Sequence, residues 1–89
     1  MRASYAYLVI LQHDSVPVRR DVVVAPLGLP QTFPVSRLQP PLLVLGDPFV
    51  LLTPEIGTIV RRFLRRPVAN LAESRYRIIS ALDMLFSGS

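Results

Sequence analysis

Residues 38–53 read LQPPLLVLGDPFVLLT, and this stretch decides the fold. It holds two short apolar runs, at 42–45 and 49–53, which Gly-Asp-Pro at 46–48 separates. Short apolar runs divided by turn-forming residues predict a β-hairpin. A three-residue separator favours a longer loop over the two-residue loop of the tightest hairpins. The centre of the chain is therefore predicted to be antiparallel β-structure.

The residues before this hairpin predict further strands. YAYLVILQ at 5–12 is rich in β-branched and aromatic residues, which is typical of a buried strand. RRDVVVA at 19–25 predicts a second strand, and the proline and glycine residues that begin with Pro26 are expected to end it. Residues 31–39 are polar and rich in proline, and they fit either a strand or an extended loop.

The C-terminal part of the chain predicts one helix, over residues 71–86. Asn70 and Glu73 resemble a capping box at its start, and Gly88 is placed to end it. Residues 56–68 before the helix fit either two short strands or a short helix. The apolar face of the predicted helix, widened by Ile79, repeats at spacings of three, four and seven and consists of Leu71, Ile78, Leu82, Leu85 and Phe86.

The composition predicts one small domain, residues 1–89, that associates with a copy of itself. The chain is 51% hydrophobic, and its mean hydropathy is +0.41. This is more apolar material than one core of this size readily hides, which favours a homodimer. No apolar run approaches the roughly 18 residues of a membrane span, and no signal-peptide pattern is present, so we expect a cytoplasmic protein that does not bind membranes.

The residues needed for catalysis or metal binding are scarce. His13 is the sole histidine, and the chain has no cysteine. Metal sites and thiol or serine–histidine nucleophiles therefore lack their usual side chains. There is no lysine and no phosphate-binding glycine loop, and the acidic residues are scattered. We expect a binding protein rather than an enzyme, with no cofactor and no metal.

All ten basic residues are arginines, and the net charge is +4. Four of them lie in RRFLRR at 61–66: Arg61, Arg62, Arg65 and Arg66. On a helix they would share one face, and on a strand they would fall on both faces. The run fits a solvated edge or a patch for an acidic partner. Direct binding of nucleic acid is not expected, because no aromatic residues or groove-reading motif accompany it.

A series of short motifs runs through the chain in a fixed order. They are YAYLVILQ at 5–12, VAPL at 24–27, LQPPLLVLGD at 38–47, LTP at 52–54, VANL at 68–71 and ALDMLFSGS at 81–89. In this order, and with this chain end, the sequence resembles the CcdB family of bacterial toxin proteins. The resemblance covers essentially the whole chain, although no single motif is specific alone.

The resemblance implies a mostly β fold with one C-terminal helix, in which a twisted antiparallel sheet forms an SH3-like barrel. It also implies a symmetric homodimer and a non-enzymatic toxin of a type II toxin–antitoxin system. Such a toxin poisons DNA gyrase by binding the A subunit of the enzyme, and a CcdA-like antitoxin neutralises it. The acidic tail of such an antitoxin makes Arg61, Arg62, Arg65 and Arg66 candidate antitoxin contacts.

The resemblance further implies a gyrase-contact tip, where the family poison ends in Trp-Gly-Ile. The aligned residues here are Ser87, Gly88 and Ser89, and Phe86 precedes them. A buried Trp anchor commonly contributes about 2 kcal/mol or more to binding, and Ser cannot replace it. We therefore expect weaker gyrase binding, or contact displaced to neighbours such as Phe86.

The start of the chain also departs from the family pattern. Family members have an extra strand before the segment that matches Tyr5, and that first strand is expected to be missing here. Two other functions stay open beside gyrase poisoning. A dimer of this fold can act through antitoxin binding or operon co-repression alone. The related Kid and MazF toxins of the same fold cleave RNA.

Overall fold

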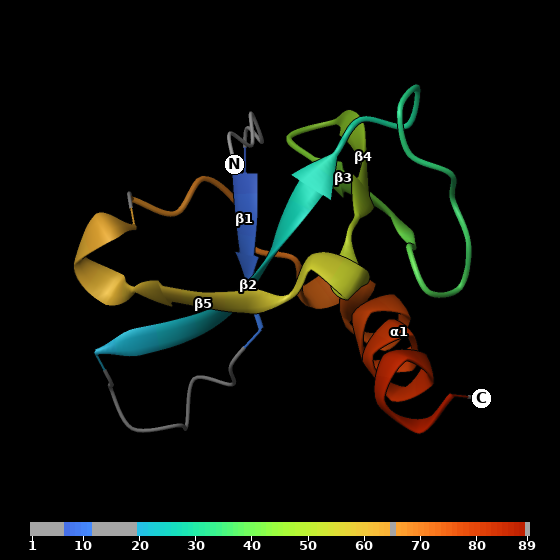
Figure 1. The fold of residues 1–89 in the computed structure, drawn as a ribbon. Helices are drawn as coiled ribbons and strands as arrows, with labels where there is room; N and C mark the ends of the chain where they lie inside the picture. Colours follow the sequence, from blue (N-terminus) through green and yellow to red (C-terminus); the bar gives the residue numbers. More distant parts are fainter. Residues whose placement is uncertain (1–6, 12–19, 65, 89) are drawn as a thin grey trace.

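The computed structural model describes residues 7–11, 20–64 and 66–88 (Figure 1). In this part of the chain a five-stranded antiparallel sheet is followed by one α-helix. The strands are β1 (Tyr7–Ile10), β2 (Asp21–Gly28), β3 (Pro41–Val44), β4 (Asp47–Leu51) and β5 (Gly57–Val60). The helix α1 spans Arg75–Ser87, and single 3₁₀ turns occur at η1 (Thr53–Glu55), η2 (Arg61–Phe63) and η3 (Ala72–Ser74).

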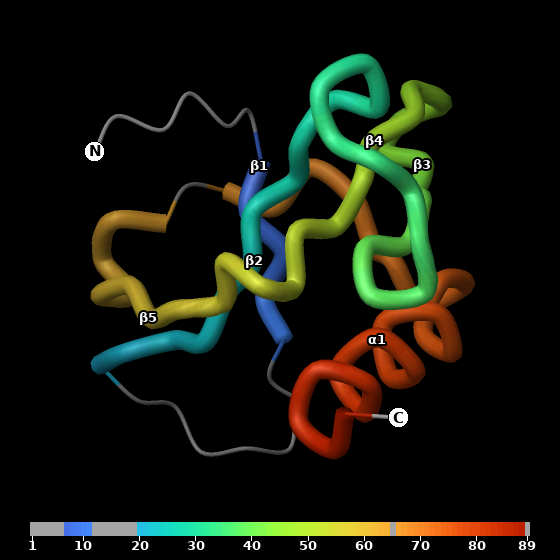
Figure 2. The backbone as a smooth tube through the Cα atoms, turned by 45° about the vertical axis from the view of Figure 1, so that its right-hand side comes forward, coloured from blue at the N-terminus to red at the C-terminus, as the bar shows by residue number. Residues whose placement is uncertain are grey.

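Strand β2 organises the sheet because it has neighbours on both sides. β1 pairs with it from Val24 to Leu27 on one side. On the other side β5 pairs with its first half, and β4 pairs with its end at Leu27 and Gly28. The sheet therefore curls around β2 into an open half-barrel, and β3 completes the order β1-β2-β4-β3 (Figures 1 and 2). The predicted fold class, mostly β with one C-terminal helix, is confirmed.

Pro26 lies inside β2, so the prediction that it ends the strand is wrong. Leu11 N–H donates to Val23 O at 3.0 Å. In an antiparallel pair every second residue bonds to the partner strand, so Val23, Ala25 and Leu27 are the residues of β2 that bond to β1. By that alternation the backbone nitrogen of Pro26 points away from β1. On that other side β2 pairs with β5 up to Val24 and with β4 from Leu27, so neither strand pairs with Pro26. The missing N–H of the proline therefore costs the sheet no hydrogen bond. The carbonyl of Pro26 accepts the N–H of Leu52 at 3.0 Å.

The central hairpin forms as β3 and β4, but with a shorter loop than predicted. Val44 pairs with Asp47, so only Leu45 and Gly46 lie between the strands. Both have positive φ, +53° and +87°, as a type I′ turn requires. Asp47 and Pro48 belong to β4 rather than to the loop. The predicted longer loop is therefore wrong.

The residues around the hairpin settle two alternatives left open by the sequence. Residues 31–39 form a loop of turns and bends rather than a strand. The described residues of the segment 56–68, namely 56–64 and 66–68, contain one strand, β5, and one 3₁₀ turn, η2, instead of two strands or a helix. Residues 1–6, which bear on the expected missing first strand, lie outside the described residues.

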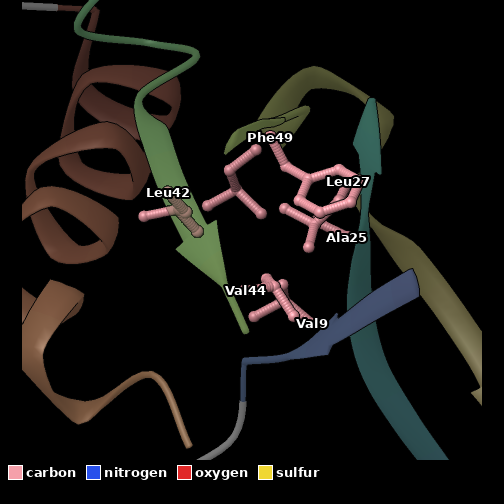
Figure 3. Packing of buried hydrophobic residues seen from close by; sticks show 7 residues of the cluster. Val9, Ala25, Leu27, Leu42, Val44 and Phe49 are labelled. Carbon is pink, nitrogen blue, oxygen red and sulfur yellow. The ribbon is translucent and has the colours of Figure 1, made fainter. Parts of the chain in front are cut away.

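The core lies between the curled sheet and α1. Its buried side chains come from four strands and point toward one another (Figure 3). The rings of Tyr7 and Phe49 meet edge to face, with centroids 5.4 Å apart. Leu71 and Ile78 pack against this cluster from the helical side. The buried members of the cluster are Val9, Ala25, Leu27, Leu42, Val44, Phe49 and Leu51.

The helix begins later than predicted, and most of its predicted apolar face is half-buried, namely Leu71, Ile78, Leu82 and Leu85. Asn70 Oδ1 accepts the N–H of Ala72, the first residue of the turn η3, at 2.8 Å, and α1 follows at Arg75. Ala81 is its fully buried residue. Phe86 is 74% exposed, so its predicted place on the core-facing side is wrong. Among the described residues no helix has the length and apolarity needed to cross a membrane.

Gly28 at the end of β2 has no room for a side chain. A Cβ built there would lie 2.4 Å from Phe33 Cδ2 and 3.1 Å from Leu52 Cδ1. We expect Gly28→Ala to lower the free energy of unfolding by about 1–3 kcal/mol, the usual cost of overpacking. Urea denaturation measures this change. In a Phe33→Ala background the same substitution should cost less, and equal costs in both backgrounds would contradict the proposed clash.

Candidate functional site

The first candidate region is the end of α1, where the sequence places the tip. Gly88 has φ +76° and ψ +14°, and its N–H donates to Met84 O at 2.9 Å. This left-handed residue, closed by a single hydrogen bond, ends the helix as the position of the glycine predicted. The last described residues of the chain are therefore held on a regular helix up to Ser87.

The side chains near this end differ in what they expose. Phe86 presents its ring to solvent and lies three and seven residues from Asp83 and Ile79 on the same outer side of α1. Ser87 Oγ donates to Asp83 O at 2.5 Å, so the hydroxyl is bound to its own helix. Ser89 lies outside the described residues. The tip thus offers an aromatic ring and backbone, with Ser87 turned back on the helix.

The second candidate region is the arginine run after β5. The strand ends at Val60, η2 follows, and Leu64 is already extended, with φ −79° and ψ +142°. Over the described residues 61–64 and 66, neither the α-helix nor the strand considered for the run is formed. Arg61, Arg62 and Arg66 are exposed, and Arg65 lies outside the described residues. The Arg62 guanidinium lies 5.1 Å from the centre of the exposed Phe63 ring, within cation–π range.

Arg20 joins this basic region, although no pattern in the sequence indicates it. The N–H of Arg61 donates to Arg20 O at 2.7 Å, because the pairing of Asp21 with Val60 brings the ends of β2 and β5 together. Arg20 is exposed. We call Arg20, Arg61, Arg62 and Arg66 the basic surface. The signal that would have found Arg20 is the β2–β5 pairing, which joins residues about forty positions apart.

The two candidate regions are well separated. In both views η2 and the C-terminal end of α1 lie on opposite sides of the molecule (Figures 1 and 2). A partner that contacts both regions of one chain must therefore reach around it. The arrangement supports two independent binding surfaces rather than one compact site.

Two further features that could mark a site in the described residues are a metal-binding cluster and a buried polar side chain. Among these residues no three histidine, cysteine, aspartate or glutamate side chains lie close enough together to hold a metal ion. His13 lies outside the described residues. Thr53 is the buried polar side chain in this part of the chain, and its Oγ1 donates to Leu38 O, a contact that fixes the loop before β3.

A family model decides what kind of protein this is. The model of the CcdB protein matches residues 1–88. The chain belongs to the CcdB family. Membership of the CcdB family implies a toxin of a toxin–antitoxin system, and the curled sheet with one C-terminal helix is consistent with the CcdB fold. A search of curated proteins found no match.

Proposed function

We propose that this CcdB-family toxin binds the A subunit of DNA gyrase through the tip formed by Phe86, Ser87, Gly88 and Ser89. The observation that carries the proposal is the match to the CcdB family up to residue 88, which includes the end of α1. The regular helix and its Gly88 stop give the tip a defined direction, as insertion between two gyrase subunits requires. The mode of action is non-enzymatic, because binding alone traps the target.

The acting unit in this proposal is a cytoplasmic homodimer. Its support is the apolar surface left exposed on the described part of the chain, on β1, on the β3–β4 hairpin and on α1. Exposed apolar surface of this kind is typical of interaction sites, and an interface between two copies would remove it from water. The exposed apolar residues assigned to the interface are Leu8 and Ile10 on β1, Leu45 on the hairpin and Ile79 on α1.

The experiment that tests the proposal is controlled expression in a gyrase-sensitive bacterium. Induction is expected to produce DNA breaks and growth arrest, and a host whose gyrase A is resistant to CcdB-type poisons should be spared. A variant cut before Phe86 serves as the matched control, because it lacks the tip but keeps the start of α1. Breaks that persist in the resistant host would show a different target.

One observation favours a second function, in which the dimer acts only through its antitoxin or by co-repressing its operon. Ser87 replaces the large apolar anchor of the family tip, and its hydroxyl is bonded to Asp83 O. In this second function the dimer keeps its fold and its basic surface but no longer binds gyrase. Arrest-free induction, together with tight antitoxin binding, would move this function to first place. RNA cleavage, by contrast, gains no support from any feature of the described residues.

We propose further that Arg61, Arg62, Arg65 and Arg66 bind the acidic C-terminal tail of a CcdA-like antitoxin. Exposed ion pairs contribute only about 0.2–1 kcal/mol each, so the effect is cumulative. Changing all four arginines to Gln is expected to weaken binding of such a tail, measured by calorimetry, and high salt should weaken binding to the natural chain. Arg75→Gln, an exposed change on α1, is the control. Binding that is indifferent to salt and to the fourfold change would contradict the assignment.

A further inference from the structure

A second surface with a positive character lies between the loop before β3 and the first half of α1. It is a groove of about 410 Å³, within the 300–1,000 Å³ range of sites that bind small molecules or short peptide segments. In both views this loop lies beside α1, while η2 lies on the far side (Figures 1 and 2). The groove is lined by Ser36, Arg37 and Pro40–Pro41 from the loop and by Tyr76, Arg77 and Ser80 from the helix.

The loop wall of the groove is held in shape by its own hydrogen bonds. Ser36 N–H donates to Gln39 O at 3.0 Å, and Gln39 N–H donates back to Ser36 Oγ at 3.0 Å. Gln39 Nε2 donates to Pro34 O at 3.0 Å, and buried Thr53 donates to Leu38 O. The backbone that carries Arg37 is therefore fastened to the core, so the loop wall needs little backbone ordering when a ligand binds.

The helix wall is tied to the loop wall by Arg77. Its Nη1 donates to Pro41 O at 3.1 Å, and both residues line the groove. A guanidinium group has five N–H donors in a planar fork, and this bond uses one of them. Arg77 is therefore positioned by the sheet and keeps donors for a ligand.

The lining combines positive charge with apolar ring surface. Arg37 and Arg77 approach from different walls, and no lining residue is acidic. Tyr76 is 86% exposed, and Pro40 and Pro41 add further ring surface beside it. Paired guanidinium groups select carboxylate or phosphate, whereas exposed aromatic and proline rings favour apolar side chains.

We propose that this groove binds an acidic peptide segment that alternates carboxylate and apolar side chains. A carboxylate lies between Arg37 and Arg77, and the neighbouring apolar side chain packs on Tyr76 and the two prolines. The site is distinct from the tip and from the basic surface, so it stands whether or not this toxin binds gyrase.

The test is a titration of the ¹⁵N-labelled protein with the acetylated peptide Glu-Leu-Glu-Leu-Glu. Amide shifts are expected at residues 36–41 and 76–80, and a Gln-Leu-Gln-Leu-Gln peptide should bind at least about tenfold more weakly. Arg37→Gln, an exposed change that leaves the loop hydrogen bonds intact, should weaken binding at least about fivefold. Arg75→Gln on the same helix should leave it unchanged.

Three results would overturn the proposal. One is equal binding of the glutamate and glutamine peptides. The second is a set of shifts centred on residues 61–66, with Arg37→Gln as tight as the natural chain. The third is that inorganic phosphate or a single-stranded oligonucleotide produces the same shifts at lower concentration, which would assign the groove to a phosphate group instead.

Discussion

Leu42→Ala is expected to lower the free energy of unfolding by about 2–5 kcal/mol, the range for deleting a large buried aliphatic side chain. Leu42 is 1% exposed and belongs to the core cluster (Figure 3). Strand β3 is only four residues long and is fixed by its pairing with β4, so little backbone movement can fill the cavity. Urea denaturation followed by circular dichroism measures the change.

The neighbouring residue provides a matched control. Leu43 is 64% exposed on the opposite face of the same strand, and Leu43→Ala removes the same atoms. We expect a change within about 0.5 kcal/mol for that variant. Both variants should be measured at one protein concentration, because association of copies adds to apparent stability. Similar losses at both positions would show that Leu43 is also buried, in an interface between copies, or that the core is not the one described.

The hairpin shows how far local sequence specifies the fold. Two apolar runs flanking a glycine were enough to predict its existence, and the alternation of buried Leu42 with exposed Leu43 follows from the pleat. The loop was predicted wrongly because Leu45 carries a positive φ that Asn, Asp or Gly usually carries. A Leu-Gly pair does not resemble a type I′ turn in sequence, so the tertiary pairing of β3 with β4 outweighs the local preference.

Proline residues were misread for a related reason. Pro26 and Pro48 both lie inside strands. A proline is tolerated where its nitrogen faces a gap in the sheet, and the position of that gap depends on strands far away in the chain. Pro26 lies opposite Leu8, between Val24, where the pairing of β2 with β5 stops, and Leu27, where its pairing with β4 starts. The residues next to Pro26 in the sequence do not indicate that the partner strand of β2 changes at this position.

The residues of the candidate sites were likewise predictable where they depend on neighbouring sequence, and not where they depend on distant contacts. Gly88 was predictable because a helix stop depends on a few consecutive residues. Arg20 was missed because the pairing of β2 with β5 places it beside Arg61. The groove was missed because Arg37 and Arg77, which line it, are forty positions apart in the sequence, and only the packing of α1 beside the loop before β3 brings them to one groove.

Restoring the family anchor should strengthen gyrase binding by about 2 kcal/mol or more, roughly thirtyfold. The double change is Ser87→Trp with Ser89→Ile, which rebuilds the family's Trp-Gly-Ile around the natural Gly88. Ser87 is exposed at the end of α1, so a larger side chain there meets solvent rather than the core. Titration of a gyrase A fragment against the natural and restored proteins measures the change.

Gly88 supplies the sharpest control for this experiment. A Cβ at Gly88 meets nothing within 4 Å, so Gly88→Ala in the restored protein costs only the strain of its positive φ, about 1–2 kcal/mol. If the tip anchors gyrase, that strain misdirects the Trp, and much of the gained affinity is lost while sedimentation still reports about twice 10.0 kDa. Equal affinity of the natural and restored proteins would show that the tip is not the anchor. If the natural and restored proteins are both folded dimers and neither binds, gyrase is not the target. The restored protein would then carry the family side chains on an intact α1, so the lack of binding could not be attributed to either.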